Sequence, residues 1–264
     1  MELNLTGKSA VVTGGTLGIG KAIALAFAKE GCSVSVCSRN PKNVEASVKE
    51  FEKAGYSILA KTADVTNYDS ICGFRNEVMN RFGKIDIWVN NAGNSYYKLL
   101  MDYEIGEWCM GVDLNMNSVF FSAKSIVPIM KRAGGGVIIN ASSYAAVIPI
   151  VGKGCYSAAK SGMLSLTRSL AGELAPYNIR VVAYMPGPVT TPMTAANYAV
   201  NSERIKRDLA LKRIGKPEEI ANFVVFMASD AATFMTGTHI EISGGKFCVQ
   251  NSMDAWAEAE KNPK

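Results

Sequence analysis

Short apolar runs alternate along the chain with amphipathic segments, and this alternation constrains the fold more than any other feature. The apolar runs, expected to be strands, cover residues 9–12, 34–37, 58–63, 85–89, 137–141, 181–183 and 241–243. Segments between them carry apolar residues at helical spacing, as at Ile23, Ala26 and Phe27, and we expect helices at 21–30, 43–54 and 70–82. The pattern predicts an α/β fold in one domain over residues 1–264, a doubly wound parallel sheet flanked by helices on both faces.

Composition and charge exclude several classes of protein. Hydrophobic residues make up 48% of the chain and charged residues 19%, so intrinsic disorder is excluded. The net charge is only +5 and Lys and Arg do not cluster, so we expect no nucleic-acid partner. The longest apolar stretch, residues 144–152, is far shorter than the ~18 residues of a membrane helix, and the N-terminus lacks signal-peptide features. We therefore expect a cytoplasmic protein without a membrane partner.

The cysteine and histidine content argues against disulfides, metal sites and triad hydrolases. The six cysteines lack a C-x-x-C pair, and we expect reduced core residues at Cys32, Cys37, Cys72, Cys109, Cys155 and Cys248. The one histidine, His239, lies in an alternating run and is expected to be a strand residue, so no metal is expected. A Ser-His-Asp hydrolase would also need a G-x-S-x-G turn, which the sequence lacks.

The first expected strand and helix are joined by a glycine-rich turn with the sequence Thr13-Gly14-Gly15-Thr16-Leu17-Gly18-Ile19-Gly20. Glycines here let the backbone approach a pyrophosphate, whose charge is stabilised by the free N–H groups at the start of the helix. A P-loop would need Ser or Thr where Ala22 stands, and the G-x-G-x-x-G fingerprint fails because Ile23 occupies its last position. The remaining pattern is T-G-x-x-x-G-x-G, with a turn that binds no ligand as the competing interpretation.

Further motifs follow the glycine turn in order along the strand–helix alternation. They are Asp64-Val65, Asn90-Asn91-Ala92-Gly93, Asn115, Ser143, Tyr156-x-x-x-Lys160 and Pro186-Gly187. With these motifs over nearly its whole length, the chain resembles the classical short-chain dehydrogenase/reductase family. The resemblance implies a single Rossmann-type domain that interconverts a carbonyl and a secondary alcohol by hydride transfer with a nicotinamide cofactor.

The resemblance also implies which residues form the site. The catalytic residues would be Asn115, Ser143, Tyr156 and Lys160. The cofactor would contact Gly14, Thr16, Leu17, Gly18, Ile19, Gly20, Ser38, Arg39, Asp64, Val65, Asn91, Ala92, Gly93, Tyr156, Lys160, Pro186, Gly187, Val189 and Thr191. In similar proteins the aspartate meets the adenine amine, the Asn-Ala-Gly segment lines the adenosine side, and the turn after the sixth strand receives the nicotinamide carboxamide. We expect Asp86 and Asn90 to be structural and to tie strand ends together.

The choice between NADP(H) and NAD(H) depends on the end of the second strand. A carboxylate ~20 residues beyond the glycines would bind the ribose 2′-hydroxyl of NAD and repel a 2′-phosphate. This chain has Ser38-Arg39 instead, and the planar guanidinium suits a phosphate. The sequence therefore favours NADP(H), with NAD(H) as second choice if Arg39 pairs with a surface carboxylate.

Tyr156 and Lys160 are four residues apart on an expected helix and therefore project from one face. A free tyrosine has a pKa near ~10, and a neighbouring ammonium, together with an oxidised nicotinamide, lowers it by stabilising the phenolate. We expect Tyr156 to act as general acid toward a carbonyl or as general base toward an alcohol. By resemblance, Lys160 also binds the nicotinamide ribose.

Two further residues have roles implied by the resemblance. Ser143 would orient and polarise the substrate oxygen, with its neighbour Ser142 as the weaker candidate. Asn115 would hold a water that connects Lys160 to solvent, and an Asn inside an apolar helix is otherwise unfavourable. Asn117 is expected to point elsewhere.

The substrate end is less determined. The resemblance places mostly apolar and aromatic residues there: Tyr96, Tyr97, Tyr144, Ile148, Val151, Lys153, Met185 and residues 193–212. Lys98 and Lys153 would suit an acidic group. A 3-oxoacyl thioester, a steroid, a sugar and a quinone all remain open as substrates.

Three further features concern the second half of the chain. Residues 192–213 are long for a loop and are expected to form a lid, with a helix at 202–211. The tail, residues 246–264, either packs on a neighbouring subunit or is partly disordered. The resemblance implies a homotetramer, with a homodimer second, and small or apolar residues on several faces of the expected helix at 157–175 agree with it.

Other functions stay open. The same chemistry could run as an NAD-dependent dehydrogenase of a hydroxysteroid, sugar or 3-hydroxyacyl substrate. A nucleotide-binding regulator without catalysis is a different class, but its usual sign would be an incomplete set of catalytic residues. An epimerase or dehydratase of the extended type would need a longer substrate domain and a different glycine spacing.

Overall fold

A seven-stranded parallel sheet forms the centre of the molecule, seen here in a computed structural model that describes residues 2–246 and 248–261. Its strands lie in the order β3-β2-β1-β4-β5-β6-β7. Their bounds are β1 Ser9–Thr13, β2 Ser33–Ser38, β3 Ile58–Thr62, β4 Ile87–Asn90, β5 Gly136–Ala141, β6 Ile179–Pro186 and β7 His239–Ile242. The order reverses between β1 and β4, and the carboxyl ends of the strands at such a switch point are where open α/β sheets bind ligands.

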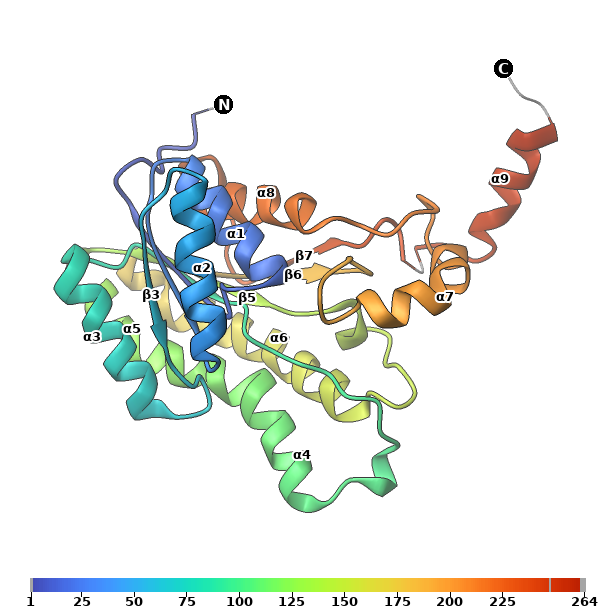
Figure 1. The fold of residues 1–264 in the computed structure, drawn as a ribbon, viewed down its shortest axis with the longest axis horizontal. Helices are drawn as coiled ribbons and strands as arrows, with labels where there is room; N and C mark the ends of the chain where they lie inside the picture. Colours follow the sequence, from blue (N-terminus) through green and yellow to red (C-terminus); the bar gives the residue numbers. More distant parts are fainter. Residues whose placement is uncertain (1, 247, 262–264) are drawn as a thin grey trace.

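Helices cover both faces of the sheet (Figure 1). One face carries α1 Gly18–Lys29, α2 Pro41–Lys53 and α8 Pro217–Ala228. The other carries α3 Tyr68–Phe82, α4 Ile105–Val112, α5 Ser118–Ala133 and α6 Gly154–Leu174. The predicted fold class, a doubly wound parallel sheet flanked by helices on both faces, is therefore confirmed.

Successive residues of the central strands pack into the two hydrophobic cores on opposite faces of the sheet. Val12 faces the α1 and α8 side, where it packs with Phe27 and Val224, whereas Val11 faces the α3 and α5 side. Both valines are fully buried. Because successive side chains of a strand point to opposite faces, a sheet covered on both sides needs the continuous apolar strands seen in this sequence.

The last third of the chain contains two helices at the right of Figure 1, α7 Ala195–Arg207 and α9 Ser252–Lys261. The lid helix predicted at 202–211 is thus wrong at both ends: it begins earlier, because alanine favours helix even in a polar segment without apolar periodicity, and it ends already at Arg207. The α9 helix contacts its own chain, since Trp256 Nε1 donates to the Ala210 carbonyl at 2.9 Å. Residues 247 and 262–264 of the predicted tail lie outside the described residues.

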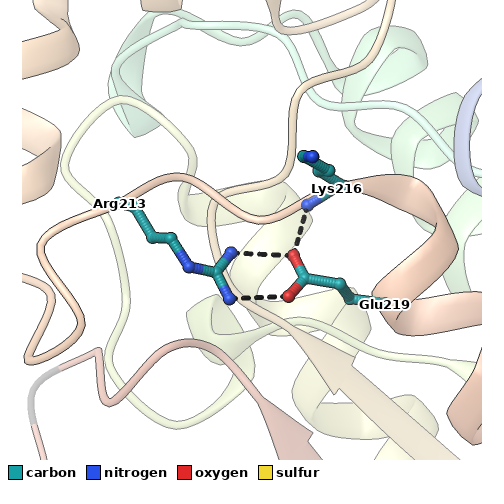
Figure 2. A network of polar contacts seen from close by, with 3 residues as sticks. All are labelled: Arg213, Lys216 and Glu219. Carbon is teal, nitrogen blue, oxygen red and sulfur yellow. Dashed lines mark hydrogen bonds and ion pairs between the residues drawn. The ribbon is translucent and has the colours of Figure 1, made fainter.

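A three-residue network anchors the far end of the predicted lid (Figure 2). The Arg213 guanidinium bonds both carboxylate oxygens of Glu219, at 2.6 and 2.9 Å, and the Lys216 backbone N–H donates to the same carboxylate at 2.8 Å. These bonds hold the pKa of Glu219 down at about 2, chiefly through the Arg213 hydrogen bonds. Glu219 lies in the first turn of α8, so the network ties the end of the lid to a helix packed on the sheet.

Several element boundaries differ from the sequence prediction. The first helix begins at Gly18, inside the glycine turn, and the sixth strand runs on to Pro186, where no further strand N–H is needed. The last strand includes His239, which confirms the prediction for that residue. All six cysteines are free thiols, but only Cys37 and Cys155 are buried as predicted; Cys32 and Cys72 are partly exposed, and Cys109 and Cys248 are exposed. None of the helices formed by the described residues is long and apolar enough to cross a membrane.

Candidate active site

The carboxyl ends of the central strands surround a cavity of about 510 Å³. The turn after β1, the segment after β4, the serines after β5 and the turn after β6 all line it. Of the predicted site residues, the cavity brings together Gly14, Leu17, Gly18, Ile19, Gly20, Ser38, Arg39, Val65, Asn91, Ala92, Gly93, Ser143, Tyr156, Lys160, Pro186, Gly187, Val189 and Thr191. Positions as much as 177 residues apart in the chain therefore share one site, because the parallel strands end at the same edge.

Three predicted residues do not line this cavity. Thr16 is buried, with 4% of its surface exposed. Asp64 accepts hydrogen bonds from the Thr66 N–H at 2.9 Å and the Thr66 hydroxyl at 2.7 Å. Asn115 lies behind Gly93, as described below. These residues can therefore support the walls of the cavity, and a direct contact of Asp64 with a ligand would have to use its other carboxylate oxygen.

The glycine turn is held against β4 at close range. A Cβ atom on Gly20 would lie only 2.3 Å from both the Asn91 side-chain nitrogen and the Gly14 carbonyl oxygen, so no other residue fits there. The α1 helix starts beside it, and Leu17, its N-cap residue, supplies no side-chain hydrogen bond to the first turn. The free N–H groups of that turn form the anion site that a pyrophosphate needs.

Asn91 connects the glycine turn to the sixth strand. Its amide donates to the Thr13 and Gly14 carbonyls at 3.0 and 3.2 Å, and its oxygen accepts the Tyr184 hydroxyl at 3.0 Å. The Thr13 hydroxyl in turn accepts the backbone N–H groups of Asn91 and Ala92. The sequence had indicated a cofactor contact for Asn91, and the structure shows that its side chain also fixes the relative positions of β1, β4 and β6.

Asp86 and Asn90 are structural, as predicted. The Asp86 carboxylate accepts the Ser9 backbone N–H at 2.7 Å. Asn90 accepts the Trp88 indole N–H and donates to Asn140, each at 2.9 Å. Both residues therefore hold neighbouring strands in register.

Arg39 follows the end of β2 and lines the cavity there. Its side chain is exposed and has no ion pair or hydrogen bond with any described residue. The pairing of Arg39 with a surface carboxylate, which would have favoured NAD(H), is therefore not formed within the described part of the chain. Ser38 beside it accepts the Asn40 N–H at 3.3 Å. The guanidinium is therefore available to a ligand.

Tyr156 and Lys160 enter the cavity from the first turns of α6, with the ammonium 5.7 Å from the centre of the tyrosine ring. The Lys160 ammonium also donates to the Ala141 carbonyl at 2.7 Å. Burial lowers the pKa of Lys160 to about 8. Burial raises the pKa of Tyr156, and a hydrogen bond from Ser143 acts in the opposite direction. Among the protein's own groups, burial therefore outweighs the Ser143 hydrogen bond, and the lowered pKa expected beside an oxidised nicotinamide stays a prediction.

Asn115 lies in a π-helical turn, Asp113–Asn117, between α4 and α5, rather than inside a regular helix. Such turns are frequent at functional sites. Its amide donates to the Asn94 and Gly111 carbonyls at 2.9 and 3.0 Å. A Cβ atom on Gly93 would lie 2.9 Å from the Asn115 oxygen and 3.3 Å from the Lys160 nitrogen, so these two polar atoms converge on one point of the backbone.

Ser142 and Asn117, which lie close in sequence to the predicted catalytic residues Ser143 and Asn115, make other contacts, as expected. The Ser142 hydroxyl faces the Lys160 carbonyl at 3.5 Å, and Ser143 accepts the Ala145 N–H at 3.2 Å. Asn117 points away from the site and donates to Asp113 at 2.7 Å. Ser143 is thus the serine that reaches Tyr156.

The substrate end differs more from the prediction. Tyr144, Lys153, Met193, Thr194 and Tyr198 line the cavity. The other predicted contacts do not: Met185 packs in the core with Leu164 and Ala183, Lys98 pairs with Glu107, and Tyr96, Tyr97, Ile148 and Val151 are exposed outside the cavity. Tyr184, Asn94 and Ile150 line it without having been predicted. Tyr184 had one signal in the sequence, its place directly after the strand expected at 181–183 and two residues before Pro186.

Comparisons with known proteins agree with this geometry. A family model described as enoyl-(acyl carrier protein) reductase matches residues 14–246. A 3-oxoacyl-[acyl-carrier-protein] reductase of Thermotoga maritima is 36% identical over 243 residues, which cover 92% of this chain and 99% of the relative. The enzyme of the same name from Staphylococcus aureus is 39% identical over 241 residues, covering 91% and 98%.

A solved structure agrees as well. The crystal structure of a short-chain type dehydrogenase/reductase from Mycobacterium marinum matches with a TM-score of 0.88 at 33% identity, covering 94% of this chain and 98% of that one. The motifs, the strand order and these relatives lead to one conclusion: the chain belongs to the short-chain dehydrogenase/reductase family and is an oxidoreductase.

Proposed function

We propose that the protein is an NADP(H)-dependent reductase that interconverts a carbonyl and a secondary alcohol. The observation that carries this proposal is one cavity lined by Tyr156, Lys160 and Ser143 at one end and by Arg39 at the other. A proton donor and a site for a phosphate are thereby separated along one elongated space.

The residues present fit a dinucleotide. The first turn of α1 offers free N–H groups to the pyrophosphate, and the close approach at Gly20 leaves the backbone accessible. Arg39 would bind the 2′-phosphate, Lys160 the nicotinamide ribose, and Val189 and Thr191 the carboxamide. When bound, the reduced nicotinamide supplies the hydride that reaches the carbonyl carbon.

Tyr156 is the proposed proton donor. Burial raises its pKa, so the hydroxyl keeps its proton at neutral pH and can give it to the carbonyl oxygen as the alcohol forms. Ser143 hydrogen-bonds the same substrate oxygen and also stabilises the tyrosinate left after the transfer. The Lys160 ammonium stabilises that tyrosinate through its charge.

Asn115 completes the proposed set of catalytic residues by holding a water. Its oxygen and the Lys160 nitrogen would lie 2.9 and 3.3 Å from a Cβ atom on Gly93, and this closeness to one point supports a water that contacts both. A water there would pass protons between Lys160 and solvent and so restore the proton of Tyr156.

Residues 192–213 are the proposed lid of this single domain, and residues 246–264 its tail. Thr191, next to the lid, is adjacent to the glycine turn, since a Cβ atom on Gly18 would lie 3.3 Å from its Cβ. Tyr198 of α7 reaches into the cavity. Closure would therefore bring α7 over both ligands.

We further propose a cytoplasmic homotetramer, with a homodimer as the alternative. Apolar side chains exposed on α4 and α5 support an interface between copies: Ile105 is 80% exposed, Met110 65% and Phe120 47%. Patches of this kind mark association sites.

The test is a titration of the purified protein with NADPH and NADH, followed by nicotinamide fluorescence, and then assays with carbonyl compounds. The relatives' names make a 3-oxoacyl thioester the first substrate to try. Tighter NADPH binding and NADPH-dependent reduction are expected. Tighter NADH binding would instead favour the NAD-dependent alcohol dehydrogenase, and binding of neither nucleotide would favour a role without catalysis.

A further inference from the structure

The cavity is lined by positive charge alone. Its charged residues are Arg39, Lys153 and Lys160, and among the described residues that line it there is no Asp or Glu. An anion is therefore favoured along the whole cavity. The proposed function uses two of these cations, Arg39 for a phosphate and Lys160 for a ribose and the tyrosinate, and leaves the third without a role.

Lys153 is the cation at the substrate end. It is the N-cap residue of α6, three positions before Tyr156, and both side chains line the cavity. Its side chain is half-buried and has no hydrogen bond or ion pair with any of the described residues. Lys98, the other lysine expected near the substrate, is instead paired with Glu107. The charge of Lys98 is therefore neutralised by a carboxylate of the protein, whereas the charge of Lys153 is not neutralised by any described residue.

The position of Lys153 is unfavourable for a charge that the protein leaves unpaired. Burial lowers the pKa of its ammonium, which means that the charged form is destabilised there. The start of the 21-residue helix α6 also carries the positive end of the helix dipole, which repels a cation. A bound anion would offset both effects.

The surroundings of Lys153 complete a site for a small organic anion. Tyr144, Ile150, Met193 and Tyr198 line the same cavity and offer apolar and aromatic surface. Because Lys153 and Tyr156 are separated by about one helical turn, a single molecule can reach both. Its carbonyl would then meet Tyr156 while its anionic group meets Lys153.

We propose that Lys153 is a specificity-determining residue that binds a carboxylate or phosphate of the substrate, so that the preferred substrate is an anionic ketone. This inference rests on the proposed function, because it assigns the substrate class of the same site. A charge-assisted hydrogen bond of this kind corresponds to a preference of about 10- to 100-fold over a neutral analogue.

The first test measures binding and needs no turnover. The complex of the protein with NADPH is titrated by calorimetry with straight-chain alkanoates of increasing length and with the matching primary amides. We expect the best alkanoate to bind about 10- to 100-fold more tightly than its amide in the unmodified protein and in Lys153→Arg. The preference should disappear in Lys153→Met and persist in the matched control Lys98→Met. Equal binding of acid and amide, or an unchanged preference in Lys153→Met, overturns the proposal.

The second test identifies the source of the anion by kinetics. It compares kcat/KM for oxo acids with that for their methyl esters, and for 3-oxobutanoyl phosphopantetheine with that for 3-oxobutanoyl pantetheine. A preference for the free acid that Lys153→Met removes assigns a carboxylate, and a preference for the phosphorylated thioester assigns a phosphate. Turnover that is no better for the anionic member of either pair contradicts the role of Lys153 and leaves the reductase assignment intact. Turnover of none of these carbonyls rejects the reductase, while the calorimetry still decides whether Lys153 binds an anion.

Discussion

The two ends of the cavity are built in different ways. At the cofactor end, the contacts come from strand ends, and Asn91, Thr13 and Tyr184 link three strands through hydrogen bonds. At the substrate end they come from α7 and from the segment before α6, where side chains are more exposed; Met193, for example, is 60% exposed. The comparison indicates that the sheet itself holds the proposed cofactor end in place, whereas the proposed substrate end depends on elements with few buried contacts and therefore low local stability.

At the proposed substrate end, the residues that follow α7 contact the C-terminal segment, outside the sheet. The Lys246 ammonium pairs with Asp208 just after α7 at 2.7 Å, and Leu209 and Lys246 form an isolated antiparallel bridge. In α9, Trp256 bonds the Ala210 carbonyl and Glu260 pairs with Lys212. The described part of the C-terminal segment therefore contacts its own chain beside the proposed lid.

The largest expected effect separates chemistry from binding. Tyr156→Phe removes the proposed proton donor, and we expect kcat for a ketone to fall about 10²- to 10⁴-fold. The Kd of NADPH should stay within about twofold, because the ring remains and the cofactor end is untouched. Stopped-flow turnover and a fluorescence titration check both values, and near-normal kcat would reject Tyr156 as the acid.

We expect Lys160→Met to abolish activity and to raise the free energy of unfolding. Burial lowers the pKa of Lys160 from 10.5 to about 8, which at ~1.4 kcal/mol per pKa unit makes its charge cost about 3 kcal/mol. The variant loses the bond to Ala141, so we expect it to be about 1–3 kcal/mol more stable at pH 7 and inactive. Urea unfolding of both proteins measures the difference.

The pH dependence of that difference has a definite sign. Between pH 8 and pH 10.5 the unfolded chain keeps the Lys160 proton while the folded protein releases it, so the stability of the unmodified protein rises with pH. The advantage of Lys160→Met should therefore be complete below about pH 8 and vanish by about pH 10.5. An advantage that stays constant to pH 10.5 would show that the lysine charge is not its cause.

Arg39→Ala tests the cofactor end alone. Loss of a charge-assisted bond to the 2′-phosphate should raise the Kd of NADPH about 10- to 100-fold and leave that of NADH nearly unchanged. Lys42→Ala, a nearby exposed lysine that does not line the cavity, is the matched control. Equal loss of affinity for both nucleotides would mean that Arg39 does not read the phosphate.

The smallest expected effect concerns the anchor of the lid. Glu219→Gln breaks the pairing with Arg213, and because the two side chains are 39% and 52% exposed, solvent screens the pair and we expect a loss of only about 0.5–1 kcal/mol at pH 7. The folded pKa of Glu219, about 2, lies below its ordinary value of 4.5, so this stability is present above pH 4.5 and is lost as the pH falls towards 2.

The matching readouts are thermal unfolding at pH 7 and at pH 3, and KM. A rise in KM for the ketone with an unchanged Kd of NADPH would agree with a lid that serves the substrate end. A change in the NADPH Kd alone would contradict the separation of the two ends.

The positions of the strand ends could be predicted from the sequence, because apolar runs and short motifs mark them locally. Apolar runs marked the strands, and Gly20 was predictable as part of the glycine pattern between the first strand and helix; the structure gives the reason, since a Cβ atom there would lie 2.3 Å from the Gly14 carbonyl oxygen. The start of α7 at Ala195 was not predictable from periodicity, because none of its residues is buried and no apolar pattern is required. The position of Met185 in the core likewise depends on Leu164, more than 20 residues away in the chain.

The sequence by itself determined the sheet, the order of elements along the chain and the residue types at the proposed cofactor and catalytic positions, since these follow from the hydrophobic period and from motifs within single turns. Only the tertiary structure decided in which direction the pKa of Tyr156 shifts, and that the side chains of Arg39 and Lys153 have no ion pair or hydrogen bond with any described residue. Each of these depends on burial and on which distant groups come within hydrogen-bonding reach, and neither quantity is encoded in local spacing.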